Sequence, residues 1–270
     1  MKVAVGELSP WTFRTACVVI SGLGLMALAA LAGERMAVSR PLWPALLAVA
    51  ALNVTGWHLF SAFSLVHMGG GHGALVAYTM PLWAALLSAL YLKERLSARR
   101  LAALALGMAG IALLVGPELV GTGGSALGPL LMVGAAMCWA GGIVTMKRQR
   151  WPVGIMALTG WQLLLGGVPI VLAWLVIEPH PDLSRLTWAG ASATLYAATV
   201  ALIFCFAAHN KVVTLLPATV AAISTLAIPV VGLISSAWLL GEPLGWRELA
   251  ALVMVVTAIA LVLLPEPVRA

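Results

Sequence analysis

Long apolar stretches alternate with short polar segments along almost the whole chain. Nine of these stretches reach the roughly 17–25 residues that a helix needs to cross a bilayer. They lie near residues 10–33, 42–67, 73–92, 100–117, 126–146, 154–177, 188–212, 217–240 and 245–264. The pattern therefore predicts an all-α polytopic membrane protein with nine transmembrane helices joined by short connections.

The composition supports the same fold class. Of the 270 residues, 62% are hydrophobic and only 9% are charged, whereas a soluble domain carries roughly 25% charged residues. The formal net charge is +6, but the cations gather in short loops between apolar runs, so we expect no nucleic-acid partner. Cys17, Cys138 and Cys205 all fall inside apolar runs, which gives no disulfide framework and no metal-binding spacing. We expect no metal and no cofactor.

The charge of the loops alternates from one connection to the next. The loops after the first, third, fifth, seventh and ninth runs hold eleven Lys and Arg residues, and the intervening loops hold only Arg185 and Arg247. By the positive-inside rule the first set of loops is cytoplasmic. We therefore expect the C-terminus in the cytoplasm and Met1 on the opposite side.

The two halves of the chain repeat each other at a spacing of 148 residues. The matching pairs are Pro81 and Pro229, Glu94 and Glu242, and Arg99 and Arg247. The turn "KERLSARR" in the first half is strongly basic, whereas its counterpart "GEPLGWRE" lacks that excess of cations. The two turns are thus expected on opposite sides of the membrane. This predicts an inverted repeat, with residues 1–120 as the first copy and 126–270 as the second, an architecture of many secondary transporters.

The two copies differ in their number of apolar runs. The second copy has five runs and the first has four, and the counterpart of the run at 126–146 would lie upstream of Met1. Opposite orientation requires an odd number of helices in each copy. We therefore expect ten helices in the complete protein, with the first one missing from this sequence.

Pro81 and Pro229 each lie inside an apolar run. Proline removes a backbone donor, and in lipid the freed carbonyl must be satisfied by neighbouring groups. The two prolines are interpreted either as a pair of gating kinks or as packing kinks without a gating role. Ser97, just before the run at 100–117, is expected to cap that helix.

Two long motifs carry a resemblance to a known family. They are "MPLWAALLSALYLKERLSARRLAALALGMAGIALL" and "IPVVGLISSAWLLGEPLGWRELAALVMVVTAIALVL", each an apolar helix after a proline, a Glu, a polar turn and an Ala/Gly-rich helix. This chain resembles the drug/metabolite transporter superfamily, EamA type. The resemblance implies a ten-helix carrier of the bacterial inner membrane that exports amino acids or other small metabolites and is not an enzyme.

Several polar and aromatic positions inside the runs are candidates for a substrate cavity. Asn53, Trp57, Ser61 and Ser64 share one helical face, and polar groups at membrane depth usually face a cavity or the bundle interior. The other candidates are His58, Tyr78, Trp139, Gln162 and Tyr196. Trp57, His58 and Tyr78 are similar to cavity-lining positions of the aromatic amino-acid exporters in this superfamily. The alternative is that all these side chains only pack helix against helix.

The charged residues narrow the substrate class. All nine acidic residues lie in loops or at run ends, and Arg14 is the one cation well inside a run. We expect Arg14 to snorkel outward, and the alternative is that it attracts an anionic group at the outer mouth. His58 either shapes the pocket as a neutral group or relays protons. We predict an alternating-access carrier for a small zwitterion, most simply an amino acid. The alternatives are a small-cation or multidrug exporter, which needs a buried carboxylate, and a membrane scaffold or sensor that transports nothing.

The unequal copies generate the first prediction. A hydrophobic segment of about 20 residues should be encoded directly upstream of Met1. Sequencing the upstream reading frame tests this expectation. A stop codon there, together with normal transport by the 270-residue chain, would contradict it.

Overall fold

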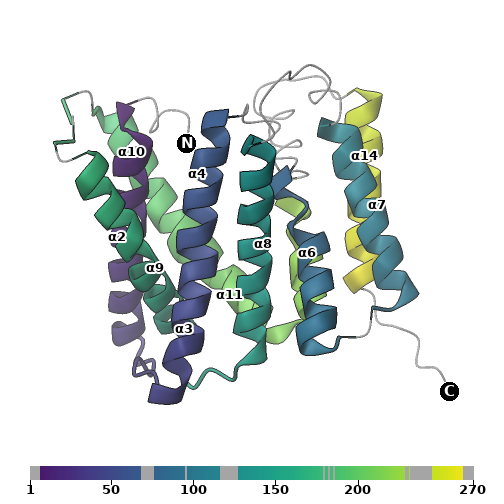
Figure 1. Cartoon of the computed structure of the whole chain (residues 1–270), viewed down its shortest axis with the longest axis horizontal. Coiled ribbons are helices and arrows are strands. Elements are labelled where there is room, and N and C mark those ends of the chain that lie inside the picture. The colour runs from purple at the N-terminus through teal and green to yellow at the C-terminus, as the bar shows by residue number, and fades with distance from the viewer. Residues whose placement is uncertain are drawn as a thin grey trace. The chain divides into compact units, whose positions relative to one another are not determined.

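Figure 1 shows the computed structural model of the chain, in which every regular element of the described residues is a helix. The described residues are 7–67, 76–94, 96–115, 127–178, 180–181, 183–184, 186–228, 231 and 245–263. The all-α class predicted from the apolar runs is therefore confirmed over this part of the chain. The run predicted at 217–240 lies partly outside it.

Five helical segments of the described residues are long and apolar enough to cross a membrane. They are Pro10–Leu31, Arg40–Ser64, Leu127–Arg148, Ile155–Ile177 and Trp188–Leu215. Two shorter apolar segments are Met80–Leu92 and Leu249–Leu261. Each of these seven segments coincides with one of the predicted runs, because a helix satisfies its own backbone polar groups wherever water is absent.

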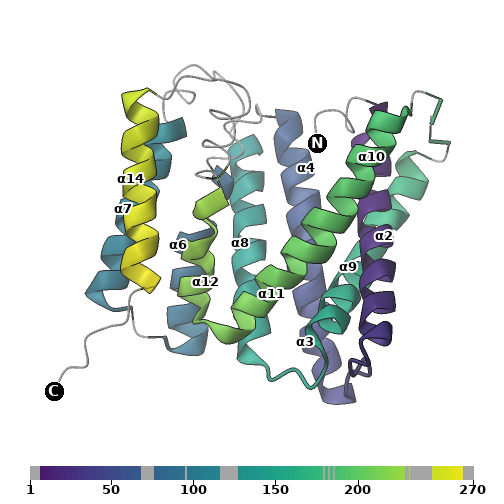
Figure 2. The ribbon, with the colours of Figure 1, turned by 180° about the vertical axis from the view of Figure 1, so that it is seen from behind.

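Some of the long segments are composite. The elements are α2 (Pro10–Leu31), η1 (Arg40–Leu42), α3 (Trp43–Ala50), η2 (Ala51–Gly56), α4 (Trp57–His67), α6 (Met80–Leu87), η3 (Ser88–Leu92), α7 (Ala98–Val115), α8 (Leu127–Arg148), α9 (Ile155–Ile177), α10 (Trp188–Tyr196), η5 (Ala197–Cys205), α11 (Phe206–Leu215), α12 (Ala218–Ser224) and α14 (Trp246–Leu263). The segments η2, η3 and η5 are π-helical, a form that is rare and often found at functional sites. Figure 2 shows α10 and α11 running on through η5 as one long helix.

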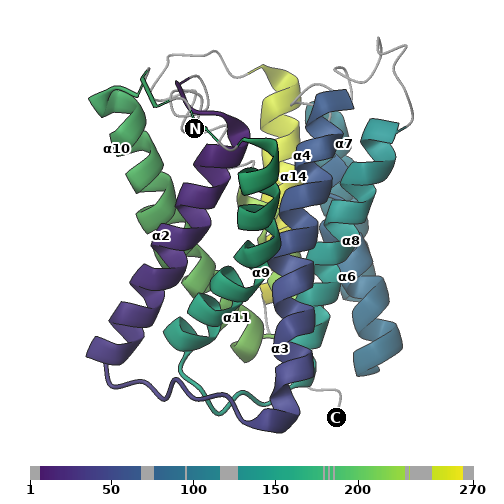
Figure 3. The ribbon, with the colours of Figure 1, turned by 60° about the vertical axis from the view of Figure 1, so that its left-hand side comes forward.

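The described residues divide into two compact units. Unit 1 comprises Met1–Leu59 and Thr145–Leu215, and unit 2 comprises Phe60–Val144 and Leu216–Ala270. In unit 1, α2 packs along α9, and the two helices lie side by side in Figure 3. The helix α2 also contacts η5, and α9 contacts η2. Gly166 permits the close approach of α9 to the run of α3 and η2, since a Cβ there would overlap the carbonyl oxygen of Ala50.

The helices α2 and α9 each supply a carboxylate to the beginning of the other. Glu34, just beyond α2, accepts a hydrogen bond from the backbone N–H of Ala157 at 3.0 Å, in the first turn of α9. Glu178, just beyond α9, accepts hydrogen bonds from Ser9, the N-cap of α2, and from Thr12. The first N–H groups of a helix have no partner within it and carry a partial positive charge. At α9 the carboxylate of Glu34 satisfies one such N–H directly. At α2 the hydroxyl of Ser9 accepts from the N–H of Thr12, and Glu178 accepts from the hydroxyls of Ser9 and Thr12.

The same arrangement recurs at two more helix starts. Glu7 accepts hydrogen bonds from the backbone N–H of Thr187 at 2.9 Å and from its hydroxyl, at the beginning of α10. Glu94 accepts from the N–H of Ala218 at 2.9 Å and from the hydroxyl of Thr219 at 3.1 Å, at the beginning of α12. Every acidic side chain that the structure describes thus lies at the N-terminus of another helix. For these four residues, the prediction that acids occupy run ends is confirmed.

In unit 2, α7 and α14 lie side by side, as Figures 1 and 2 show. Gly107 and Gly110 face this contact: a Cβ on Gly107 would lie 3.4 Å from Ala258, and one on Gly110 would lie 3.0 Å from Val255, both on α14. These small residues therefore permit the two helices to pack closely. The hydroxyl of Ser97 accepts from the N–H of Arg100 at 3.4 Å, so the predicted cap of α7 is confirmed as well.

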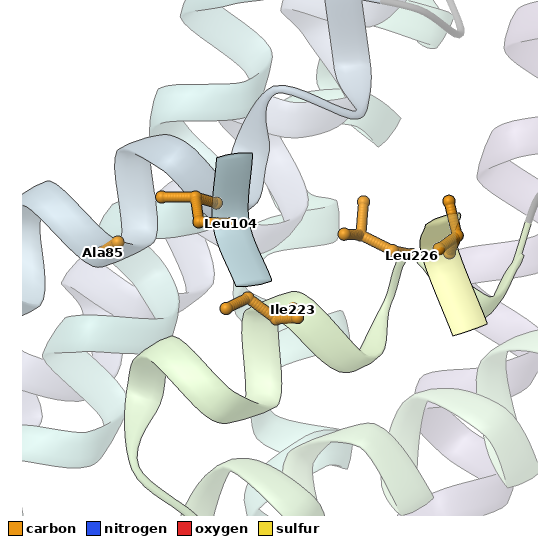
Figure 4. Packing of buried hydrophobic residues seen from close by; sticks show 5 residues of the cluster. Ala85, Leu104, Ile223 and Leu226 are labelled. Atoms are coloured by element: carbon orange, nitrogen blue, oxygen red, sulfur yellow. The ribbon is translucent and has the colours of Figure 1, made fainter. Parts of the chain in front are cut away.

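A hydrophobic cluster fills the interior of unit 2. Figure 4 shows Ala85 from α6, Leu104 from α7, Ile223 from α12 and Leu226 close together. Val255 from α14 completes this cluster. Four helices are therefore joined by one buried apolar core.

Pro81 begins a helix and does not bend one. The chain makes a turn at Tyr78 and Thr79, and α6 starts at Met80 with Pro81 in its first turn. A proline costs little there, because the N–H that it lacks would have no helical partner anyway. The sequence predicted a kink inside a continuous helix at Pro81. The structure instead has a break in the helix before α6. Pro229 lies outside the described residues, and a gating role of the two prolines stays a prediction.

The carboxylate caps generate a stability prediction. A side chain at Gly154 would overlap the carboxylate of Glu34, so Gly154→Ala should displace Glu34 from the beginning of α9. Losing a hydrogen bond to a charged group costs about 1.5–3 kcal/mol, which thermal unfolding in detergent would detect. Glu34→Gln should act through the same contact, and the double variant should lose less than the sum of the two.

Gly134→Ala serves as the matched control. A Cβ on Gly134 would make only ordinary contacts, at 3.5 Å or more from Phe60, and alanine favours a helix over glycine by about 1 kcal/mol. This control should therefore be at least as stable as the parent chain. If Gly154→Ala behaves like the control, the carboxylate does not stabilise the beginning of α9.

Candidate functional site

A cluster of buried amide and hydroxyl groups lies inside unit 1. Asn210 on α11 donates to the hydroxyl of Thr159 at 3.0 Å and to the side-chain oxygen of Gln162 at 3.4 Å, both on α9. Asn210 and Gln162 are fully buried. The Nε2 of Gln162 lies 3.8 Å from the sulfur of Met146 on α8. The cluster ties three helices together through neutral polar groups.

Asn210 was missed as a site residue by the reasoning from sequence. Its position beside Lys211 near the end of an apolar run suggests the membrane interface, but α11 continues to Leu215 and buries Asn210 completely. Its Oδ1 is buried without a hydrogen-bond partner among the described residues. A buried polar atom left unpaired costs about 1–3 kcal/mol, so this oxygen favours a donor from a bound molecule.

Asn53 is the second deeply buried amide of unit 1. It lies in η2, is 3% exposed, and its Oδ1 has no hydrogen-bond partner among the described residues. In the same segment, the hydroxyl of Thr55 donates to the carbonyl of Gly166 on α9 at 2.7 Å. The π-helical turn is therefore held against α9, with the amide of Asn53 on its buried side.

Trp57 and His58 follow directly in α4 and are half-buried. The guanidinium of Arg14 on α2 donates to the backbone carbonyl of His58. The expectation that Arg14 snorkels outward is therefore wrong: its charge is directed at the backbone of another helix. A buried carbonyl provides the acceptor that a cation at membrane depth needs.

The remaining candidates differ in their burial. In unit 1, Tyr196 is 65% exposed at the end of α10. In unit 2, Ser61 is buried on α4, and Trp139 on α8 is half-buried. Tyr78 packs against the apolar cluster of Figure 4. Gln162 belongs to the cluster around Asn210.

The described part of the chain offers little for a metal. It contains no group of three or more His, Cys, Asp or Glu side chains arranged to hold an ion. Besides Arg14 and the histidines, the polar side chains described inside the long helices are mostly amides, hydroxyls and aromatic rings. Such groups bind small molecules by hydrogen bonding and stacking.

A comparison with protein families identifies the class of protein to which this chain belongs. The model of the EamA-like transporter family matches residues 1–116 and 126–264. The chain belongs to the EamA-like transporter family. It is therefore a membrane transporter and not an enzyme, as the two long motifs predicted.

Two bacterial relatives are similar over most of their length. The chain is 28% identical over 265 residues to the "Uncharacterized transporter YvbV" of Bacillus subtilis (strain 168), covering 97% of this chain and 85% of that one. It is 31% identical over 199 residues to a "Probable amino-acid metabolite efflux pump" of Salmonella typhimurium, covering 71% of this chain and 67% of the relative.

The fold has also been seen in a crystal. One protein of known crystal structure aligns with a TM-score of 0.84 and 20% sequence identity, covering 96% of this chain and 89% of that one. At this identity the likeness concerns the fold alone. The arrangement of helices is thus shared with that protein.

The buried amide cluster generates the next prediction. Asn210→Leu should lower the thermal stability of the protein, because Gln162 and Thr159 lose a partner while remaining buried. The expected loss is about 1–3 kcal/mol. Gln162→Leu together with Asn210→Leu should cost less than the sum of the two single variants, since a buried apolar pair replaces a buried polar one.

Thr199→Ala is the control for these variants. It removes a hydroxyl that is bonded within its own helix, and it should have little effect on stability. Additive losses would show that the two amides act independently.

Proposed function

We propose that this chain is a secondary carrier that exports small zwitterionic metabolites, most simply amino acids, across the bacterial inner membrane by alternating access. Membership of the EamA-like family and the name of the Salmonella typhimurium relative support the proposal. The observation that carries the substrate class is the engagement of Glu7, Glu34, Glu94 and Glu178 at helix N-termini. A carrier for organic cations needs a carboxylate inside the membrane, and these four are bound elsewhere.

The transport mechanism rests on an inverted repeat of residues 1–120 and 126–270. A shift of 148 residues carries the bounds of α7 onto those of α14 and places α2 over α9. It also places η2 within η5. The contacts follow the same exchange, because α2 contacts η5 while α9 contacts η2. Nine membrane-spanning helices in this sequence, a cytoplasmic C-terminus and alternating access belong to the same proposal.

The substrate path is proposed to use the neutral polar and aromatic side chains inside the helices. In unit 1 these are Asn53, Trp57, His58, Gln162 and Tyr196, to which we add Asn210. The burial of Asn53 and Asn210, each with an unpartnered oxygen among the described residues, supports their role. Ammonium and carboxylate groups of an amino acid bind to such amides without a net charge in the path.

In unit 2 the proposed path residues are Ser61, Tyr78 and Trp139. Tyr78 lies in the turn that precedes Pro81 and α6. A second turn, at Thr225 and Leu226, follows α12. Interrupted helices are common at the binding sites of secondary transporters, so these breaks are the proposed hinges, with Pro81 and Pro229 beside them.

Export of a toxic amino-acid analogue from bacterial cells tests the proposal. Cells that express the chain should survive a toxic aromatic analogue better than cells with empty vector. Trp57→Ala and Tyr78→Ala should each raise the half-saturating substrate concentration about two- to tenfold, because an aromatic contact contributes about 0.5–1.5 kcal/mol beyond area burial. Trp188→Ala is the control, since Trp188 is 91% exposed. Resistance to organic cations without resistance to any amino-acid analogue would identify a multidrug exporter instead.

A further inference from the structure

Unit 1 contains a cavity of about 630 Å³ where α8 ends and α9 begins. Its wall includes Lys147 at the end of α8, Arg150 in the following turn, and Lys211 on α11. Cavities of 300–1,000 Å³ are typical of small-molecule sites. None of the residues proposed above for the substrate path lines this one, so it requires an explanation of its own.

Cations dominate the charge of this cavity. Lys147, Arg150 and Lys211 face one acid, Glu34, which leaves a net charge of +2 in the wall. Arg150 and Lys211 form no ion pair with any residue that the structure describes. Glu34 is already engaged, since its carboxylate accepts from the N–H of Ala157. The cavity therefore offers positive charge that no part of the described chain neutralises.

One of the cations is held in place by the fold. The ammonium of Lys147 donates to the backbone carbonyl of Thr214 at 3.0 Å. An ammonium has three donors, so two remain for a ligand while the first fixes the side chain. Fixing a long flexible side chain in advance lowers the entropy that binding must otherwise remove.

The remainder of the wall is partly apolar. Met146, Val153 and Leu158 line the cavity, and so does Trp151. The indole N–H of Trp151 donates to the carbonyl of Met146 at 2.8 Å, which leaves its ring for contact with a ligand. Gly154 and Ile155, at the beginning of α9, also line the cavity, but this helix N-terminus already binds the carboxylate of Glu34. The three cations are therefore the groups that remain for a ligand anion.

We propose that this cavity binds the phosphate of a phosphate ester, with Lys147, Arg150 and Lys211 as its ligands. A bare phosphate would leave most of 630 Å³ empty, whereas the glycerol part of an ester reaches the apolar wall. The ester is either the headgroup of an anionic phospholipid or a soluble molecule. Basic pockets at the cytoplasmic ends of transmembrane helices bind anionic lipid headgroups in this way. The assignment of this cavity to the cytoplasmic side of the membrane rests on the proposed topology. The set of residues that line the cavity does not depend on that topology.

Native mass spectrometry of the full chain in neutral detergent tests the proposal. Phosphatidylglycerol and phosphatidylcholine with the same acyl chains are the probes, and phosphatidylglycerol should be retained preferentially. The triple variant Lys147→Gln, Arg150→Gln, Lys211→Gln should lose that preference roughly a hundredfold, since each cation near an anionic headgroup contributes about a fivefold change in affinity. The charge-matched control is Arg35→Gln, Arg40→Gln, Arg148→Gln, whose positions do not line the cavity, and it should retain the preference.

Isothermal titration with sn-glycerol 3-phosphate distinguishes the two sources. Binding of this soluble ester that depends on the same three cations, without a preference for phosphatidylglycerol, supports the site and assigns a soluble ligand. Lys211→Gln alone leaves the contact of Lys147 with Thr214 intact and should weaken either probe about fivefold, so the test remains decisive if the triple variant fails to fold.

Three results would overturn the proposal. The first is that neither probe binds the parent chain. The second is that the charge-matched control loses as much as the triple variant, which would indicate a diffuse positive surface. The third is that binding of an amino acid depends on the three cations, whereas binding of the two esters does not. If the parent chain retains phosphatidylglycerol preferentially but exports no amino-acid analogue, only the proposed transport function is contradicted.

Discussion

The first backbone N–H groups of a helix need acceptors from outside that helix, and this structure supplies such acceptors at α9, α10 and α12 with carboxylates from elsewhere in the chain. Glu34 and Glu178 are exchanged between α2 and α9, which run antiparallel, so each helix ends near the beginning of the other. The exchange fixes the register of the two helices along each other. It also requires glycine at position 154, where a side chain would occupy the place of the carboxylate. The packing of unit 1, including η2 against α9, depends on this register.

The same constraint shapes the chemistry left for transport. The described carboxylates bound at helix N-termini lie outside the apolar parts of the helices. Much of the polarity inside the helices then comes from amides and hydroxyls, among them the buried amides Asn53, Gln162 and Asn210. The cation Arg14 is directed at a backbone carbonyl. A substrate without net charge suits such a path, because no buried charge has to be neutralised when the path empties.

Sequence reasoning succeeded where the signal is local and periodic. Apolar runs gave the helices, Ser97 gave a cap, and the motifs around Glu94 gave the family. It failed where a residue is defined by a distant partner. Nothing near Glu34 indicates that its partner is Ala157, 123 residues later. Asn210 was misjudged because its neighbour Lys211 is charged, and only the continuation of α11 shows that the amide is buried. The break before Pro81 was placed inside a helix because hydropathy does not register turns made of apolar residues.

The π-helical segments give this fold places where one residue can be gained or lost with little change in which side chains face inward. A π turn contains one residue more than an α turn, and each residue of an α-helix turns the chain by about 100°. Loss of one residue within η2, Ala51–Gly56, would let α3 run into α4 as a regular helix. Because the wider turn already absorbs the extra residue, everything beyond that point, beginning with Trp57 and His58, would keep nearly its present facing relative to α3. A one-residue deletion inside a transmembrane helix, usually regarded as damaging, would here leave the inward-facing set of side chains almost unchanged. Alignments of relatives should therefore allow gaps at η2 and η5, in the middle of the membrane, as well as in the loops.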